Sequence, residues 1–351
     1  MMTYDEFKEK IRDEIKDVLP ERYENTEVEI HTVNKNNQQL DGLTISSPDG
    51  DLVVPTIYLN SFYESYQDGE YFNDILENIA NIRTENEHKI SLDVNSITDY
   101  GIAKDRILPI VVGAEKNAAM LADRPHRNMA DLAVLYRVEL GNDTRGTMST
   151  PVTYRLLRQW NVSQDEIHKA AVENMERMNP STFKTMTQTM EDMMKEGVED
   201  NASRTSGLDV AEEEAMYVLT NVGKYNGAAA ILDEKLMEQI SEKFQEGFYI
   251  IPSSIHETLI VPKSQPLTIT YLENMVSEIN ATEVSPEEML SNHIYEYDAE
   301  KHEIIRAGKK RERETTRESI KSKLNAKKKE VHTELSGSKD LTAGRKTEPV
   351  M

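Results

Sequence analysis

The fold of this chain is decided by residues 248–261, which read FYIIPSSIHETLIV. Two apolar runs, 248–251 and 258–261, flank a polar stretch that opens with Pro252. Short runs of β-branched and aromatic residues are typical of strands, and proline followed by serine is typical of a turn. The stretch therefore predicts two neighbouring strands joined by a turn, in which a serine side chain bonds to local backbone.

Outward from this hairpin, strands and helices follow one another without the regular rhythm of a parallel sheet. Alternating apolar residues predict two further hairpins, at 28–45 and 293–306, and short apolar runs predict strands at 52–59, 107–112, 132–138 and 216–219. Helices are predicted at 3–19, 60–86, 115–121, 234–245 and 268–280, with further helix starts at Thr150 before Pro151, Ser163, Ser181 and Ser285. This mixture favours an α+β fold with mixed, largely antiparallel sheets and packed helices.

Charge and composition divide the chain into three parts. A polar stretch at 196–210 predicts a boundary between an N-terminal α+β lobe, 1–200, and a C-terminal α+β lobe, 211–305. Residues 306–351 hold 14 Lys and Arg against 7 Asp and Glu, whereas residues 1–305 carry a net charge of −29. Because this last segment has no aromatic residue, we expect a basic tail that is disordered or a solvated helix.

The composition excludes several classes of protein. The 351 residues carry a formal net charge of −22, and such a chain repels nucleic acid and acidic membranes on average. The absence of cysteine excludes disulfide frameworks, thiolate catalysis and cysteine-bound metals. The longest uncharged stretch, 52–63, is shorter than the roughly 20 apolar residues that span a membrane. The charged N-terminus lacks an apolar secretory segment, so we expect an acidic cytoplasmic protein.

Several segments together resemble a known family. They read DRILPIV at 105–111, DLAVLY at 131–136, IHKAAVEN at 167–174, NGAA at 226–229 and YIIPSSIHE at 249–257. Their order is similar to that of an uncharacterised bacterial family of unknown function, seen in gut bacteria and mobile-element surroundings and distantly similar to YtpQ-like proteins. The resemblance covers roughly residues 1–305, and PSSIHE is its most specific part. It implies a cytoplasmic bacterial α+β protein and assigns no activity.

The turn of the opening hairpin holds the most suggestive cluster. Ser253, Ser254, His256 and Glu257 bring two hydroxyls, an imidazole and a carboxylate within five residues. A catalytic serine, base and acid normally converge from separate elements, and the chain has no G-x-S-x-G motif. We therefore favour a structural turn. A contact with a ligand or partner, and a hydrolase site with Ser253 or Ser254 and His256, stay open as alternatives.

Other motifs carry weaker signals. Ser181 and Lys184 match S-x-x-K, but the companion motifs of serine acyl-enzymes are absent, so a helix start explains Ser181 better. The eight histidines show no H-x-H or H-E-x-x-H spacing, and no glycine motif for phosphate occurs. The sequence therefore predicts no catalytic residue, no metal site and no cofactor.

Arg124, His126 and Arg127 form a compact basic group in an acidic protein. Such a group can receive a carboxylate or phosphate of a ligand or partner. More often it pairs with nearby acids, here Asp123 or Asp131, and we favour that interpretation.

Methionines recur at helical spacing after Pro180. Phe183, Met186, Met190 and Met193 would share one face of a helix. Such a face is either gap-filling core, which we favour, or an adaptable partner surface.

The tail holds two basic runs and a sparse apolar pattern. The basic residues are Lys309, Lys310, Arg311, Arg313, Lys327, Lys328 and Lys329, and the apolar ones are Ile320, Leu324, Val331 and Leu335. Basic runs without aromatic residues contact phosphates but do not stack on bases. A solvated tail is favoured over a weak, non-specific nucleic-acid contact and over docking on the acidic body.

The missing catalytic motifs and the opposed charges of body and tail point to one class of function. We expect a non-enzymatic cytoplasmic interaction or accessory protein, with an unknown protein partner and no membrane contact. The alternative is the hydrolase with Ser253 or Ser254 and His256.

Overall fold

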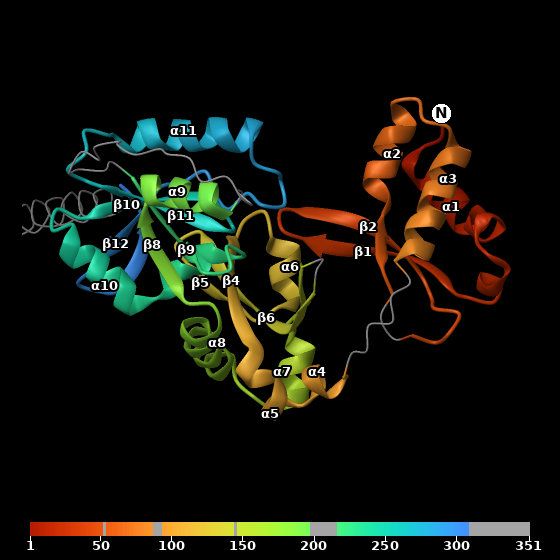
Figure 1. Ribbon diagram of the computed structural model, residues 1–351, viewed down its shortest axis with the longest axis horizontal. Helices are drawn as coiled ribbons and strands as arrows, with labels where there is room; N and C mark the ends of the chain where they lie inside the picture. The colour runs from red at the N-terminus through yellow and green to blue at the C-terminus, as the bar shows by residue number, and fades with distance from the viewer. Residues whose placement is uncertain (52–53, 87–92, 144–145, 197–215, 309–351) are drawn as a thin grey trace, which may run out of the picture.

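The chain folds into helices and three antiparallel sheets, which confirms the predicted α+β class. A computed structural model describes residues 1–51, 54–86, 93–143, 146–196 and 216–308. Figure 1 shows a smaller N-terminal part, drawn in red and orange, beside a larger part that holds the other two sheets. Most of the predicted polar boundary and of the predicted tail lies outside the described residues.

The N-terminal part packs helices on one face of a three-stranded sheet. Its strands are β1 (Val28–Lys35), β2 (Gln38–Ile45) and β3 (Thr56–Tyr58), and its helices are α1 (Tyr4–Val18), η1 (Glu21–Tyr23), α2 (Leu59–Gln67) and α3 (Phe72–Glu85). The predicted capping box of Thr3 and Glu6 starts α1, whose Phe7 is fully buried in a core of this part. The predicted helix 60–86 is two helices, because the chain turns at Gly69, where φ is 105°.

The central sheet joins β4 to β6, and β6 to β5 and β7. Its strands are β4 (Ile107–Gly113), β5 (Arg127–Met129), β6 (Leu132–Asp143) and β7 (Gly146–Pro151). The helices around it are α4 (Asn95–Thr98), α5 (Tyr100–Ala103), η2 (Lys104–Arg106), α6 (Ala118–Asp123), α7 (Tyr154–Trp160) and α8 (Gln164–Met178). Helix α8 starts with the predicted capping box of Ser163 and Glu166, and buries Ile167 and Ala171.

The C-terminal sheet has six strands in the order β13-β12-β10-β11-β9-β8. They are β8 (Ser181–Thr185), β9 (Tyr217–Asn221), β10 (Phe248–Ser254), β11 (Glu257–Pro262), β12 (Tyr295–Asp298) and β13 (Glu303–Arg306). Its helices are α9 (Met186–Glu196), η3 (Gly227–Leu232), α10 (Glu234–Lys243) and α11 (Ile269–Thr282). The two hairpins predicted for this region, β10–β11 and β12–β13, are confirmed.

Three predicted helix starts are wrong. Thr150 and Pro151 end the edge strand β7, where a proline is tolerated, and α7 begins later with Thr153 as its cap. Ser181 opens strand β8, because the chain pairs there with β9 and the methionine helix starts only after that strand. Ser285 begins a single turn instead of a helix.

The turn at Ser285 does not extend because the N-terminal hairpin uses its carbonyls. The side-chain amides of Asn36 and Asn37, at the β1–β2 tip, donate hydrogen bonds to the carbonyl oxygens of residues 286, 287 and 289. These carbonyls would otherwise accept from helical N–H groups. A tertiary contact thus overrides the local helix signal of Ser285 and Glu288.

The packing groups the chain differently from the predicted lobes. One core cluster draws on both larger sheets, from Ala103 to Ile304, so residues on both sides of the predicted boundary pack together. Strand β8, from the predicted N-terminal lobe, pairs with β9 in the C-terminal sheet. Strand β13 includes Arg306 and the next residue, Ala307, is buried, so folded structure continues past the predicted start of the tail.

Candidate functional site

The β10–β11 turn is held together by the side chains that the sequence singles out. Ser254 Oγ accepts a hydrogen bond from the His256 backbone N–H at 3.0 Å. Ser253 Oγ donates one to Glu257 Oε1 at 3.1 Å. The strand register shifts between Pro252 and Ser254, so the hairpin ends in a bulge. The expected local serine bonds are therefore present.

The imidazole of His256 is fixed by a loop that follows another strand. Its Nδ1 accepts a hydrogen bond from the backbone N–H of Asn226 at 3.0 Å, and its Nε2 lies 3.6 Å from Glu288 Oε1. Because Nδ1 is the acceptor, the neutral ring carries its proton on Nε2, toward the carboxylate. Thr220 Oγ1 donates to the His256 carbonyl oxygen at 2.7 Å and ties the turn to β9.

Tyr225 connects His256 to an arginine on the central sheet. Its ring centroid lies 5.4 Å from that of His256, and the Arg137 guanidinium lies 5.1 Å from the same tyrosine centroid. A cation is attracted to the face of a tyrosine ring. Arg137 comes from β6, Tyr225 from the loop after β9 and His256 from the β10–β11 turn, so three elements distant in sequence meet here.

The guanidinium of Arg137 is buried and incompletely paired. The residue is 6% exposed, and among the described residues neither Nε nor Nη1 has a hydrogen-bond partner. Nη2 lies 3.5 Å from Glu139 Oε2. Burial lowers the pKa of Arg137, and the Glu139 carboxylate opposes that shift. An unsatisfied buried donor costs about 1–3 kcal/mol, so the fold keeps this arrangement at a cost in stability.

The predicted basic group bonds to two other parts of the chain and within itself. Arg124 Nη2 donates to the Asn34 carbonyl oxygen of the β1–β2 hairpin at 3.4 Å. His126 Nδ1 lies 2.9 Å from the Arg124 carbonyl oxygen. Arg127 Nη2 pairs with Asp165 of α8 at 2.5 Å. Arg127 thus pairs with an acid on a neighbouring helix, whereas Asp123 acts on Arg124 through its charge, which opposes the lowering of the Arg124 pKa by burial.

A second polar cluster joins the central and C-terminal sheets. Asp131 accepts a hydrogen bond from Tyr295 Oη at 2.7 Å and pairs with His293 Nδ1 at 2.5 Å. Tyr295 Oη also lies 2.7 Å from Ser291 Oγ. Burial by itself would raise the pKa of Asp131, but the bonds from Tyr295 and His293 outweigh it and hold that pKa below its usual range. The cluster is a cross-sheet tie that keeps Asp131 ionised.

Some residues of these two clusters have a signal in the sequence, and others have none. Arg137 is the one charged residue in the apolar run LAVLYRV at 132–138, which is a signal for a buried charge. Asp131 and His293 are 162 positions apart, and no spacing pattern links them. Tyr225 gains its role only from the two side chains that pack on it.

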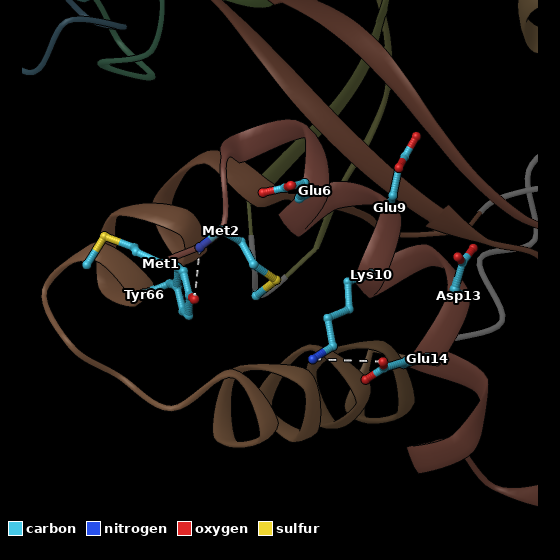
Figure 2. A pocket seen from close by; sticks show the side chains of 8 residues that line it. All are labelled: Met1, Met2, Glu6, Glu9, Lys10, Asp13, Glu14 and Tyr66. Atoms are coloured by element: carbon cyan, nitrogen blue, oxygen red, sulfur yellow. Dashed lines mark hydrogen bonds and ion pairs between the residues drawn. The ribbon is translucent and has the colours of Figure 1, made fainter.

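A shallow depression of about 560 Å³ lies beside α1 in the N-terminal part (Figure 2). Its charged side chains are acidic apart from Lys10, which pairs with Glu14 at 3.9 Å. At one end the Met2 backbone N–H donates to Tyr66 Oη at 3.2 Å. None of the predicted site residues lines this depression, which is lined by Met1, Met2, Glu6, Glu9, Lys10, Asp13, Glu14 and Tyr66.

Neither a metal-binding cluster nor a membrane-spanning helix occurs in the described ranges. No group of three or more His, Asp or Glu side chains there is arranged to hold a metal ion. No described helix is both long and apolar enough to cross a bilayer. The predicted polyanion contacts of the tail, Lys309 to Arg313 and Lys327 to Lys329, lie outside the described residues.

A family model matches most of the chain. It is described as a family of unknown function, DUF5688, and the match covers residues 4–299. The chain belongs to DUF5688. The match therefore includes all residues of the two polar clusters and excludes the basic tail. No curated protein and no solved structure matches the chain.

Proposed function

We propose that this DUF5688 member is a non-enzymatic interaction protein of the bacterial cytoplasm, which binds a carboxylate of a protein partner at Arg137. The observation that carries the proposal is the buried guanidinium, whose Nε and Nη1 have no partner in the described part of the chain. A carboxylate that reached these donors would form charge-assisted hydrogen bonds, which are roughly twice as strong as neutral ones.

The ring of Tyr225 covers the guanidinium of Arg137. Its side chain is 41% exposed while Arg137 beneath it is buried, so the ring separates the guanidinium from solvent. A movement of the Tyr225 side chain would therefore make Nε and Nη1 of Arg137 accessible to a ligand. Val222, in the same loop, is also exposed and offers apolar contact. Tyrosine and arginine with a rim of weaker contacts are typical of the energetic centre of a protein interface.

Two carboxylates near Arg137 restrict the kind of anion that the site can bind. Glu139 lies beside Arg137, and Glu288 lies beside His256. Two negative groups at the border of the site repel a phosphate dianion more than a monoanionic carboxylate. We therefore propose an Asp or Glu side chain, or a C-terminal carboxylate, as the group that the partner presents.

The contacts around His256 support binding over catalysis. The lone pair of Nδ1 is used by the Asn226 N–H, and the Ser253 and Ser254 hydroxyls bond within the turn. A serine nucleophile needs a base nitrogen within hydrogen-bond reach. The hydrolase with Ser253 or Ser254 and His256 stays an alternative prediction.

Two finer expectations stay separate from this proposal. The gut-bacterial, mobile-element and YtpQ-like connections rest on the sequence resemblance. A weak, salt-dependent and non-specific nucleic-acid contact by the tail rests on its basic runs. Neither depends on Arg137.

The test of the carboxylate site uses two probes that differ in charge. N-acetylglycine carries a carboxylate, and its N-methylamide does not. Thermal unfolding of the full chain is followed with each probe at constant ionic strength. A ligand present at tenfold its Kd, and bound by the folded state alone, stabilises that state by about 1.4 kcal/mol. We expect N-acetylglycine to raise Tm with a millimolar Kd and the amide to leave it unchanged.

Three variants decide which residue is responsible. Arg137→Gln should abolish the response, and Glu139→Gln should strengthen N-acetylglycine binding several-fold because a competing carboxylate is gone. Arg155→Gln, on an exposed position of α7, is the matched control and should respond like wild type. No wild-type response at 0.1 M N-acetylglycine, or an equal response to the amide, would refute the site. If Arg137→Gln does not fold, an unchanged affinity of Glu139→Gln refutes it instead.

A further inference from the structure

Helix α9 presents an apolar face to solvent. Met190, Met193 and Met194 are 54%, 52% and 67% exposed. The favoured interpretation of the methionine repeat as core is therefore wrong for these three residues, and Phe183 lies on β8 instead of on the helix. Single exposed apolar residues are ordinary, but three within five positions of one helix form an apolar patch, and contiguous exposed apolar patches are common at interaction sites. We call these three residues the methionine face.

The methionine face lies at one edge of the C-terminal sheet, on the side that α11 covers. Lys184 of the edge strand β8 pairs with Asp192 of α9 at 2.7 Å. In the strand register, Lys184 of β8 is paired with Val218 of β9, and Val218 is paired with Leu259 of β11. Paired residues point to the same side, so these three side chains share one face of the sheet. Leu259 packs in the core under α11. Figure 1 shows α9 and α11 on this same side.

The described chain ends at the opposite edge of the same sheet. Strand β13 is that edge, and Gly308 follows it beside Ile269, the first residue of α11. Five strand spacings of about 4.8 Å separate β13 from β8, which is about 24 Å. The twelve residues from 308 to 320 reach up to about 40 Å when extended. Residues beyond 320 can therefore reach α9 over the face that both helices share.

The segment within reach has complementary chemistry. In a helix, its apolar residues would fall within about 60° of one another around the axis; they are Ile320, Leu324, Val331 and Leu335. Residues 317–335 hold six Lys and Arg against three Asp and Glu, while residues 1–305 carry −29. Glu191 and Asp192 lie on α9 between the methionines.

We propose that the methionine face is the docking site of residues 317–335 of the same chain. The apolar positions of that segment cover the methionines, whose flexible side chains adapt to an irregular partner. Its basic residues lie against an acidic body, where the attraction weakens with salt. The docked segment is also withdrawn from other polyanions, so docking and any nucleic-acid contact of the tail compete.

The test measures methionine oxidation by hydrogen peroxide in the full chain, residue by residue, using peptide mass spectrometry. Met1, 87% exposed in the N-terminal part, is the internal reference. We expect Met190, Met193 and Met194 to oxidise at least about threefold more slowly than Met1 at low salt, and to approach its rate at 1 M salt. The variant Leu324→Ser with Val331→Ser should remove the protection.

The matched control replaces Asn325 and Thr333 by serine, in the same segment but off its apolar stripe. This control should keep the protection. Equal oxidation of the methionine face in wild type and in the Leu324→Ser, Val331→Ser variant would overturn the proposal. Protection that rises with protein concentration, together with a dimeric mass by light scattering, would assign the face to a second copy and overturn it as well.

Discussion

Asn117 and Asn37 exchange two hydrogen bonds that join the N-terminal part to the central sheet. Asn117 Oδ1 accepts from the Asn37 backbone N–H at 2.8 Å, and Asn117 Nδ2 donates to Asn37 Oδ1 at 3.0 Å. Asn117 is buried, and its Nδ2 also lies within 2.8 Å of the Gly113 carbonyl oxygen. Asn37 is left-handed, with φ 60°, a backbone conformation that asparagine tolerates in turns. Asn37 thus forms the turn of the β1–β2 hairpin and also attaches that hairpin to the central part through Asn117.

Replacing Asn117 by alanine should lower the free energy of unfolding by about 2 kcal/mol. The change leaves the Asn37 N–H and the Gly113 carbonyl without their partner, and unsatisfied buried groups cost about 1–3 kcal/mol. Urea unfolding measures the difference. Asn128→Ala, at an exposed position of β5, is the control and should change stability by less than about 0.5 kcal/mol. Equal stability of the two variants would contradict the docking role.

The Asp131 cluster should make stability depend on pH in the acid range. The pKa of Asp131 is lower in the folded chain than in the unfolded chain. Its contribution is therefore complete above about pH 4 and is lost as the pH falls through the folded value. The stability difference between wild type and Asp131→Asn should be largest above pH 4 and should shrink toward pH 2. Asp17→Asn, an exposed acid of α1, controls for the lost charge; a difference that stays constant with pH would refute the expectation.

His256→Ala should weaken the fold by about 1–2 kcal/mol without removing a chemical step. The Asn226 N–H loses its acceptor, and the β10–β11 turn loses its link to the loop after β9. His31→Ala, exposed on β1, should have little effect. Thermal unfolding is compared with a screen for esterase and peptidase activity. Activity that disappears in both His256→Ala and Ser253→Ala, with folding intact, would favour the hydrolase.

Gly227→Ala should cost about 3 kcal/mol or more. A Cβ there would lie 2.0 Å from Thr220 Oγ1 and 2.3 Å from the His256 carbonyl oxygen, so backbone must move. Gly101→Ala is the matched control, because its Cβ meets only the movable Asp99 side chain, at 3.1 Å. Chemical unfolding of both variants checks this. A small effect at Gly227 would mean that η3 does not hold the turn as closely as the structure has it.

The end of the folded part should be visible by truncation. Deleting 309–351 should lower the unfolding free energy by no more than about 1 kcal/mol, because such a tail has little apolar mass for a core. Deleting 306–351 should cost about 2 kcal/mol more, since it removes the buried Ala307, its backbone bond to Ile294 and the Arg306–Glu273 pair. Equal Tm values for the two truncated proteins would mean that the folded part ends before residue 306.

Local signals in the sequence predicted elements well where the partners are close along the chain. The capping boxes at Thr3 and Ser163 start helices, and the β10–β11 turn bonds as its serines indicate. The same kind of signal failed at Ser285, where carbonyls are bonded by Asn36 and Asn37 from the other end of the chain. It failed at Thr150 because the strand ladder with β6 continues through Pro151.

The sequence alone determined the α+β class, the acidic body and the turn chemistry of 253–257, because these depend on composition and on bonds within a few residues. Only the tertiary structure decided that Arg137, Tyr225 and His256 meet, and that Asp131 pairs with His293. Such contacts depend on which strands pair and which face of each strand is buried. A guanidinium on an apolar strand becomes a buried, partly unsatisfied donor only when the loop after β9 places Tyr225 over it.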